Sequence, residues 1–166
     1  WMIVPVMDAY AKFLSSSMDV LQITWARYFF TVVFTLSLML IFYRQSLVWS
    51  KKPMLQLIRG LILVFSTYLF FYSISFISLP KALTLAFVAP LIVTVLSPFF
   101  LKEKVGIRRW TAVSIGFIGT LIVIRPGFID FNLATFAALG NGICYGFYLI
   151  LTRKLSTSDN PLLTLQ

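Results

Sequence analysis

The sequence predicts an all-α membrane protein, a polytopic bundle of transmembrane helices. Of its 166 residues, 60% are hydrophobic and only 11% are charged, and the mean hydropathy is +0.94. Soluble domains carry about 25% charged residues, so a water-soluble globule is excluded. The longest run, residues 82–101, contains no charged residue. As a helix rising about 1.5 Å per residue, it would cross the roughly 30 Å hydrocarbon core of a bilayer.

Six spans follow from the apolar runs, at residues 1–15, 21–43, 55–77, 82–101, 110–124 and 133–152. The first is short and carries Asp8 and Lys12. The second holds Arg27 and the third Arg59, each near its start, whereas the sixth is uncharged throughout. The connections are short, so consecutive helices are expected to be antiparallel neighbours.

The basic residues set the expected orientation. If the spans alternate in direction, one side collects ten of them: Arg44, Lys51, Lys52, Arg59, Lys102, Lys104, Arg108, Arg109, Arg153 and Lys154. The other side collects four: Lys12, Arg27, Lys81 and Arg125. Positively charged connections face the cytoplasm, which predicts an inner (plasma) membrane protein with residues 44–54, 102–109 and 153–161 cytoplasmic. The net charge of +9 is thereby explained without a nucleic-acid partner.

Enzyme chemistry is not predicted. The sequence has no histidine, and its one cysteine, Cys144, lies inside an apolar run, so histidine catalysis, a disulfide framework and a cysteine metal site are excluded. Neither a cofactor nor a metal is expected. The expected partners are the lipid bilayer and a small-molecule solute, with a homodimer left open.

The candidate binding or coupling residues begin with the first hairpin. Asp8 is the one carboxylate inside a span, and a charge at that depth costs a few kcal/mol, so it needs a partner or a wet cavity. Arg27 is expected at a similar depth on the next helix, and Lys12 lies one turn after Asp8. The simpler interpretation is a structural ion pair with a lysine that reaches the surface. The alternative is an outward-facing polar site that binds solute or carries a proton.

Three further candidates lie on later spans. Pro90 is in the middle of the fourth span, where the missing N–H frees the carbonyl near Ala86 and predicts a kink beside a cavity or hinge. A purely geometric role for this proline is equally compatible with the sequence. Asn141 and Tyr145 share a face of the sixth span and are candidates for lining a cavity. Small residues recur every four positions on the last two spans, a pattern typical of close helix packing: Ala112, Gly116 and Thr120, then Ala138, Gly142 and Gly146.

An internal match suggests a duplication. Residues 12–19 can be laid over 153–160 at an offset of 141, which aligns Leu14 with Leu155 and Ser15 with Ser156. Five spans separate the two copies, so the second would enter the membrane in the opposite sense, as an inverted repeat. Polar connections match by chance easily, so the match by itself is weak.

An ordered set of motifs resembles the EamA repeat of the drug/metabolite transporter superfamily. The set comprises residues 82–90, LKEKV at 101–105, RRW at 108–110, GFIG at 116–119 and RPG at 125–127. Further segments are similar to bacterial members in particular: DAYAK at 8–12, WARYF at 25–29, LIRG at 57–60 and FFY at 70–72. Each motif is degenerate, but their order is fairly specific and covers essentially the whole chain.

The resemblance implies a ten-helix carrier built from two inverted five-helix repeats around a central cavity. Residues 1–127 would then form the first repeat, and residues 128–166 would begin a truncated second repeat. We therefore expect the chain to be part of a longer protein whose remaining four helices complete the cavity. The implied function is secondary transport of a small metabolite or drug-like solute by alternating access, with a proton as a candidate coupling ion. The resemblance does not select a substrate.

Competing functions are less consistent with the sequence. A membrane-embedded transferase would need a metal-binding acidic motif or a base, and the spans supply one carboxylate and no histidine. A dimeric exporter of the small multidrug type has four helices, whereas five spans precede the second copy of the internal match here. A membrane scaffold without transport activity is not dismissed by any sequence feature.

Overall fold

The computed structural model describes residues 3–42, 53–101, 105–124 and 132–156. These residues form only helices, their turns and short connections. In chain order the helices are α1 (Ile3–Leu14), α2 (Val20–Phe42), α3 (Pro53–Phe76), α4 (Leu79–Ala86), α5 (Val88–Leu101), α6 (Ile107–Ile124) and α7 (Leu133–Ser156). The predicted fold class, an all-α membrane bundle, is confirmed.

Four helical segments in the described part of the chain are long and apolar enough to cross a bilayer: Val20–Leu38, Pro53–Phe76, Leu79–Leu101 and Leu133–Ser156. The chain is therefore a multi-pass membrane protein. The first and fifth predicted spans correspond to α1, with 12 residues, and α6, with 18 residues, which are not among these four. Most of the large side chains on α2 are exposed, as expected for a surface that meets lipid or further helices instead of water.

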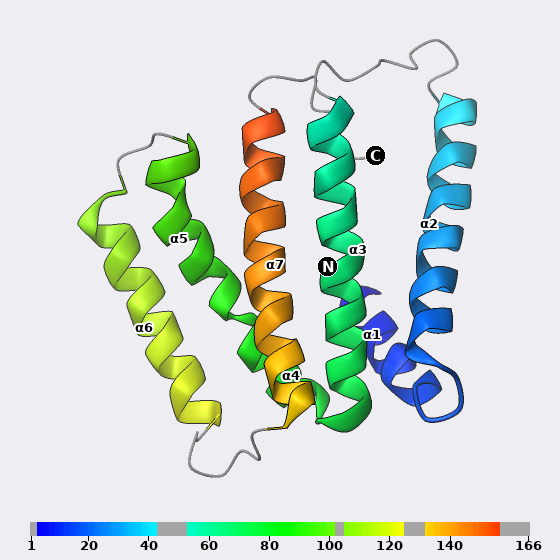
Figure 1. Cartoon of the computed structure of the whole chain (residues 1–166), viewed down its shortest axis with the longest axis horizontal. Helices are drawn as coiled ribbons and strands as arrows, with labels where there is room; N and C mark the ends of the chain where they lie inside the picture. The colour runs from blue at the N-terminus through cyan, green and yellow to red at the C-terminus, as the bar shows by residue number, and fades with distance from the viewer. Residues whose placement is uncertain (1–2, 43–52, 102–104, 125–131, 157–166) are drawn as a thin grey trace.

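Helix α7 occupies the centre of the described bundle. It lies between α3 and α5 and packs against α3, α4 and α5 (Figure 1). Helix α2 packs on α3 at one edge, and α6 packs on α5 and α4 at the other. The short helix α1 contacts α3 and α4. The last predicted span, α7, thus packs among helices that precede it by several elements. The short connections had predicted contacts only between consecutive helices.

The fourth predicted span is interrupted at Phe87, because α4 ends at Ala86 and α5 begins at Val88. The proline at position 90 has no N–H to bond the carbonyl of Ala86, so the helix breaks where that carbonyl is freed. The predicted distortion is confirmed, although it is a break in the helix and not only a kink. The side chain of Pro90 is exposed. Its role as a cavity wall stays a prediction.

Small residues bring α7 into close contact with this break. A Cβ atom added to Gly142 would lie 3.0 Å from the carbonyl oxygen of Ala86, and one added to Gly146 would lie 2.8 Å from Cβ of Ile92. The packing role predicted for the row on α7 is therefore confirmed. On α6 the result differs, since a Cβ on Gly116 would meet nothing within 4 Å among the described residues.

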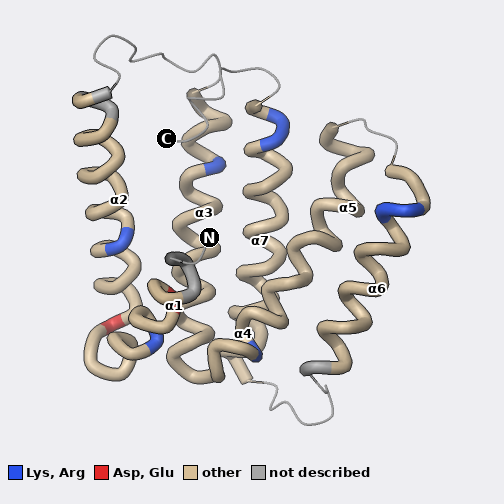
Figure 2. Tube along the Cα trace, turned by 180° about the vertical axis from the view of Figure 1, so that it is seen from behind, with Lys and Arg blue, Asp and Glu red and all other residues tan. Residues whose placement is uncertain are grey.

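The basic residues are distributed unequally between the two ends of the bundle. Helix α3 begins, α6 begins and α7 ends at the upper end of the bundle in Figure 1. These segments carry Arg59, Arg108, Arg109, Arg153 and Lys154, whereas Lys12 and Lys81 belong to segments at the opposite end. Figure 2 shows most basic positions toward the helix ends, with the one on α2 well inside. The other basic residues used for the orientation lie outside the described residues: Arg44, Lys51, Lys52, Lys102, Lys104 and Arg125.

Candidate functional site

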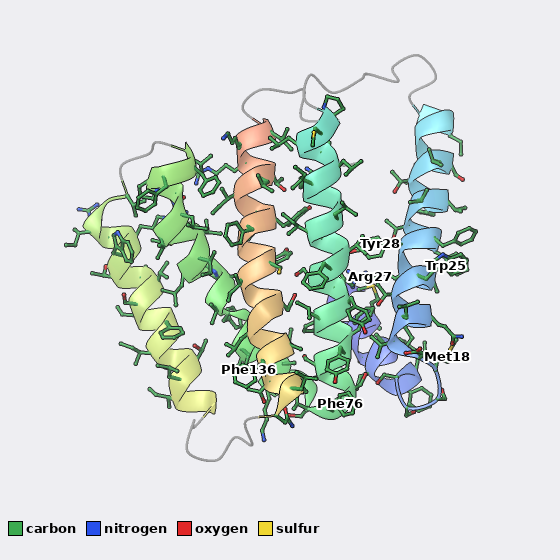
Figure 3. The ribbon with its side chains drawn as sticks, in the orientation of Figure 1. Met18, Trp25, Arg27, Tyr28, Phe76 and Phe136 are labelled. Atoms are coloured by element: carbon green, nitrogen blue, oxygen red, sulfur yellow. The ribbon has the colours of Figure 1, made fainter. Side chains whose placement is uncertain are left out.

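Arg27 is the basic residue inside α2, and its side chain lies between α2 and α3. Figure 3 shows Arg27 and Tyr28 on the side of α2 that faces α3, with Trp25 on the opposite side. The guanidinium carbon of Arg27 is 5.4 Å from the centroid of the Phe71 ring, and Phe71 on α3 is only 2% exposed. An aromatic face attracts a cation most strongly where water is excluded. This contact holds the positive charge at the border of the apolar core.

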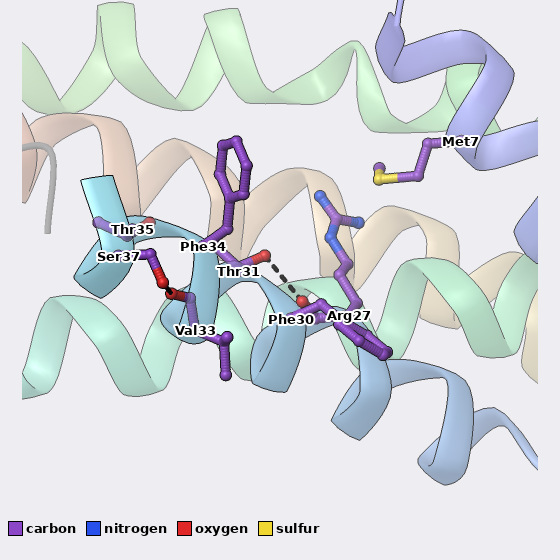
Figure 4. Close-up of a pocket in the computed structure, with 8 residues that line it drawn as sticks. All are labelled: Met7, Arg27, Phe30, Thr31, Val33, Phe34, Thr35 and Ser37. Atoms are coloured by element: carbon purple, nitrogen blue, oxygen red, sulfur yellow. Dashed lines mark hydrogen bonds between the residues drawn. The ribbon is translucent and has the colours of Figure 1, made fainter. Parts of the chain in front are cut away.

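A hollow of about 520 Å³ lies beside Arg27 (Figure 4). Its lining consists of Met7, Arg27, Phe30, Thr31, Val33, Phe34, Thr35 and Ser37. Arg27, Thr31 and Thr35 are spaced by four residues, so they form one polar stripe along α2. The side chains of Arg27 and Met7 point toward one another across the hollow (Figure 4). The hollow therefore combines a cation, hydroxyl groups and aromatic rings inside a span.

Asp8 follows Met7 on α1 and is only 7% exposed. Met7, the residue before it, lines the hollow together with Arg27. Among the residues that the structure describes, no ion pair within 4.0 Å joins Asp8 to Arg27, and the side chain of Asp8 accepts no hydrogen bond. The structural ion pair, which was the simpler sequence interpretation, is therefore wrong for these residues. The carboxylate lies on α1, whereas the guanidinium lies over the ring of Phe71 on α3.

Lys12 has a different partner from the one its spacing suggested. Its ammonium donates hydrogen bonds to the backbone carbonyls of Ile74 and Ile77, the second over 3.1 Å. These carbonyls end α3, where the helix leaves acceptors unpaired and its dipole attracts a cation. The expectation of an Asp8–Lys12 contact with a surface-reaching lysine is wrong, because the end of α3 offers the ammonium a better position. Lys12 fastens α1 to the turn between α3 and α4.

The interface between α3 and α7 is also polar. The hydroxyl of Ser66 donates to Oδ1 of Asn141 over 2.7 Å and contacts the carbonyl oxygen of Asn141 at 3.2 Å. Both residues are buried. Tyr145, one turn further on α7, is 42% exposed, and its ring stacks on that of Tyr148 with centroids 5.7 Å apart. Neither Asn141 nor Tyr145 lines the hollow beside α2, so their assignment to a cavity stays a prediction.

Sequence reasoning missed several polar members of this interior. The hydroxyl of Tyr28 is 2.7 Å from that of Thr67, and the guanidinium carbon of Arg59 lies 5.6 Å from the centroid of the Tyr148 ring. One sequence signal could have identified the buried polar face of α3. Arg59, Ser66 and Ser73 recur every seven residues, all three are buried, and a seven-residue spacing marks one side of a helix.

The pair formed by Ser66 and Asn141 gives a testable stability effect. We expect Asn141→Leu and Ser66→Ala each to lower the free energy of unfolding in detergent micelles. Interhelical hydrogen bonds in membranes contribute about 0.5–2 kcal/mol, so a double-mutant cycle should give a coupling energy in that range. Strictly additive effects of the two substitutions would contradict the hydrogen bond.

The side chains around the hollow beside α2 supply interactions that can bind a molecule. Within the described part of the chain, no three Cys, Asp or Glu side chains gather where a metal ion could be held. The hollow presents the Arg27 cation with aromatic rings and hydroxyl groups, and the buried Asp8 follows its lining residue Met7 in the chain. Such an arrangement can hold and orient a charged organic molecule.

Comparison with known proteins agrees with this membrane architecture. A model of the EamA-like transporter family matches residues 3–125. An S-adenosylmethionine uptake transporter of Rickettsia bellii is 25% identical over 153 residues, which are 92% of this chain and 52% of the relative. A riboflavin transporter of Vibrio cholerae is 33% identical over 106 residues, 63% of this chain and 36% of the relative. The chain spans about half the length of the first of these relatives. No solved structure matches it significantly.

Proposed function

The chain belongs to the EamA-like transporter family, and on that premise we propose that the protein carries a small organic solute across the membrane by alternating access. The observation that carries the proposal is Arg27, a cation kept beside a hollow inside the candidate span α2, together with the carboxylate of Asp8 buried on α1. Charges at such depth are costly, and in membrane proteins they mark solute or ion pathways. The matching relatives are named as transporters and not as enzymes.

The broken helix supports the alternating-access part of the proposal. The break at Phe87 divides one membrane crossing into α4 and α5, and α7 packs closely on both sides of it. Discontinuous helices beside a solute pathway are a recurrent feature of secondary transporters. We propose that α4 and α5 change their mutual angle at Phe87 when the pathway switches between the two sides. In the same proposal, residues 1–127 form one repeat and residues 128–166 begin the next.

The orientation belongs to the same proposal. The end of the bundle that carries Arg59, Arg108, Arg109, Arg153 and Lys154 is assigned to the cytoplasm of an inner membrane, because basic residues accumulate on that side. The hollow beside α2 then lies near the middle of that helix, which runs from Val20 to Phe42. Among the residues that the structure describes, Asp8 is the carboxylate that is buried within a helix. It is therefore the candidate for binding a coupled proton.

Transport can be measured with the product of the complete gene in proteoliposomes. We expect uptake of at least one labelled metabolite several-fold above that of vesicles without protein, starting with S-adenosylmethionine and riboflavin, the solutes named for the relatives. Verified insertion without uptake or efflux of any compound in a broad metabolite panel would overturn the proposal. The same outcome would favour a scaffold.

The site assignment has its own measurement. Asp8→Asn and Arg27→Gln should each lower the uptake rate at least tenfold, because each removes a charge inside the membrane pathway. Asp19→Asn is a matched control, since Asp19 is an exposed carboxylate in the turn between α1 and α2. Uptake that is unaffected by both site substitutions would place the solute elsewhere.

A further inference from the structure

A second cavity lies at the lower end of the bundle in Figure 1, where α3 ends and α4 and α7 begin. Its volume is about 210 Å³. A water molecule takes roughly 30 Å³ in the liquid, whereas pockets for drug-sized ligands measure roughly 300–1,000 Å³. The cavity therefore has room for a small polyatomic group. Its lining consists of Phe76, Ile77, Ser78, Lys81, Leu85, Asn132 and Thr135, and among the described residues none also lines the hollow beside α2.

Three of the lining residues offer hydrogen-bond donors. The ammonium of Lys81 and the hydroxyl of Ser78 make no hydrogen bond or ion pair with any residue that the structure describes. Asn132 precedes α7, and its Oδ1 accepts from the N–H and the hydroxyl of Thr135 over 3.0 and 3.1 Å. Because a backbone N–H can only donate, the atom facing it is the amide oxygen. The NH₂ group of Asn132 therefore remains available as a donor.

The acceptors of the adjoining turn are already engaged. The carbonyl of Ile77 accepts from the ammonium of Lys12 over 3.1 Å, and the carbonyl of Ser78 accepts from the N–H of Ala82 over 3.1 Å. Lys12 thereby brings a second positive charge to the lining. No carboxylate belongs to the lining within the described part of the chain. Donors and positive charge without a counter-charge favour an anion.

The arrangement of the donors indicates which anion fits. They come from the start of α4 and the start of α7, so they approach from more than one element. A carboxylate has two oxygens in one plane, whereas a tetrahedral phosphate presents its oxygens in several directions. The position agrees, because Lys81 is the third residue of the candidate span Leu79–Leu101. The ends of a span lie at the level of the polar headgroups.

We propose that this cavity binds a phosphate group, with the Lys81 ammonium as its counter-charge and with Ser78 and Asn132 donating to its oxygens. The phosphate belongs either to a phospholipid of the bilayer or to a soluble phosphate compound. This site is separate from the solute pathway, so its test does not depend on the outcome of the transport measurement.

The first test measures binding to the purified product of the complete gene in detergent micelles with two matched pairs. Phosphatidic acid is compared with the diacylglycerol of the same acyl chains, and glycerol 3-phosphate is compared with glycerol. We expect at least one phosphate compound to bind about tenfold more tightly than its partner, the gain typical of a charge-assisted hydrogen bond. A preference limited to phosphatidic acid would support a lipid headgroup, whereas one that includes glycerol 3-phosphate would support a soluble compound. Equal binding within both pairs, or no binding by folded protein, would overturn the proposal.

The second test removes the counter-charge. Lys81 is exposed, so Lys81→Gln should leave the fold intact while it weakens binding of the preferred phosphate compound about tenfold. Arg108→Gln is the matched control, because Arg108 is an exposed cation at the start of α6, at the opposite end of the bundle. It should change the affinity less than about twofold. Equal weakening by both substitutions would overturn the site, because net charge alone would then account for it.

The third test uses Asn132→Asp, which keeps the shape of the side chain. Asp and Asn cap a helix about equally well, so the bond to the N–H of Thr135 and the start of α7 should be preserved. The substitution replaces the donating NH₂ group by a negatively charged oxygen. We expect binding of the phosphate compound to fall about tenfold or more, with an unchanged melting temperature in the absence of phosphate. Unchanged affinity in this variant would overturn the proposal.

Discussion

Replacing Gly146 by leucine is expected to separate α7 from α5 and to prevent normal folding of the bundle. The first added carbon would lie 2.8 Å from Cβ and Cγ2 of Ile92 and 3.2 Å from the backbone carbonyl oxygen of Ala89. Branched side chains and backbone cannot give way cheaply, and overpacking costs about 3 kcal/mol or more when a whole isobutyl group is inserted. The measurement is the free energy of unfolding in detergent micelles, together with the yield of monodisperse protein.

Gly116→Leu on α6 is the matched control for this substitution. A Cβ at Gly116 would meet nothing within 4 Å, so the leucine has room among the described residues. Leucine favours a helix over glycine by about 1 kcal/mol, which makes a neutral or slightly stabilising result the expectation in micelles. Equal losses for the two variants would show that close packing at Gly146 is not the cause.

Replacing Lys12 by methionine is expected to destabilise the first hairpin. The ammonium donates to the carbonyls of Ile74 and Ile77 at the end of α3, and methionine keeps the length of the side chain without any donor. Hydrogen bonds from charged donors contribute roughly 1.5–3 kcal/mol, so a loss of about 3 kcal/mol is expected for the pair. Faster hydrogen exchange at the turn between α3 and α4 should accompany it.

Lys81→Met removes a lysine that is exposed near the start of α4. Surface substitutions of this kind usually change stability by less than about 0.5 kcal/mol. If Lys12→Met were as stable as this control, the contact between α1 and α3 would have no energetic importance, and Lys12 would again be a candidate for solute binding.

The sequence directed attention to part of this candidate site. The cost of a charge inside an apolar run drew attention to Asp8 and Arg27, and that argument needs no knowledge of packing. The interpretation of how they interact was wrong, because spacing along a helix reports only neighbours on the same helix. The carbonyls that hold Lys12 are 62 and 65 residues away. The hydrogen bond between Ser66 and Asn141 joins residues 75 apart, so the sequence could single out Asn141 but not its partner.

The sequence by itself determined that the chain is helical and lies in a membrane, since runs of apolar residues set helix length and leave no room for a soluble core. It also determined where the fourth span is interrupted, because a proline removes a particular hydrogen bond wherever it occurs. Only the tertiary structure decided that α7 packs between α3 and α5, and that Arg27 lies beside a hollow and over the ring of Phe71. Those outcomes depend on the depth and angle at which helices cross, which are fixed by contacts between distant side chains and backbones and not by hydropathy.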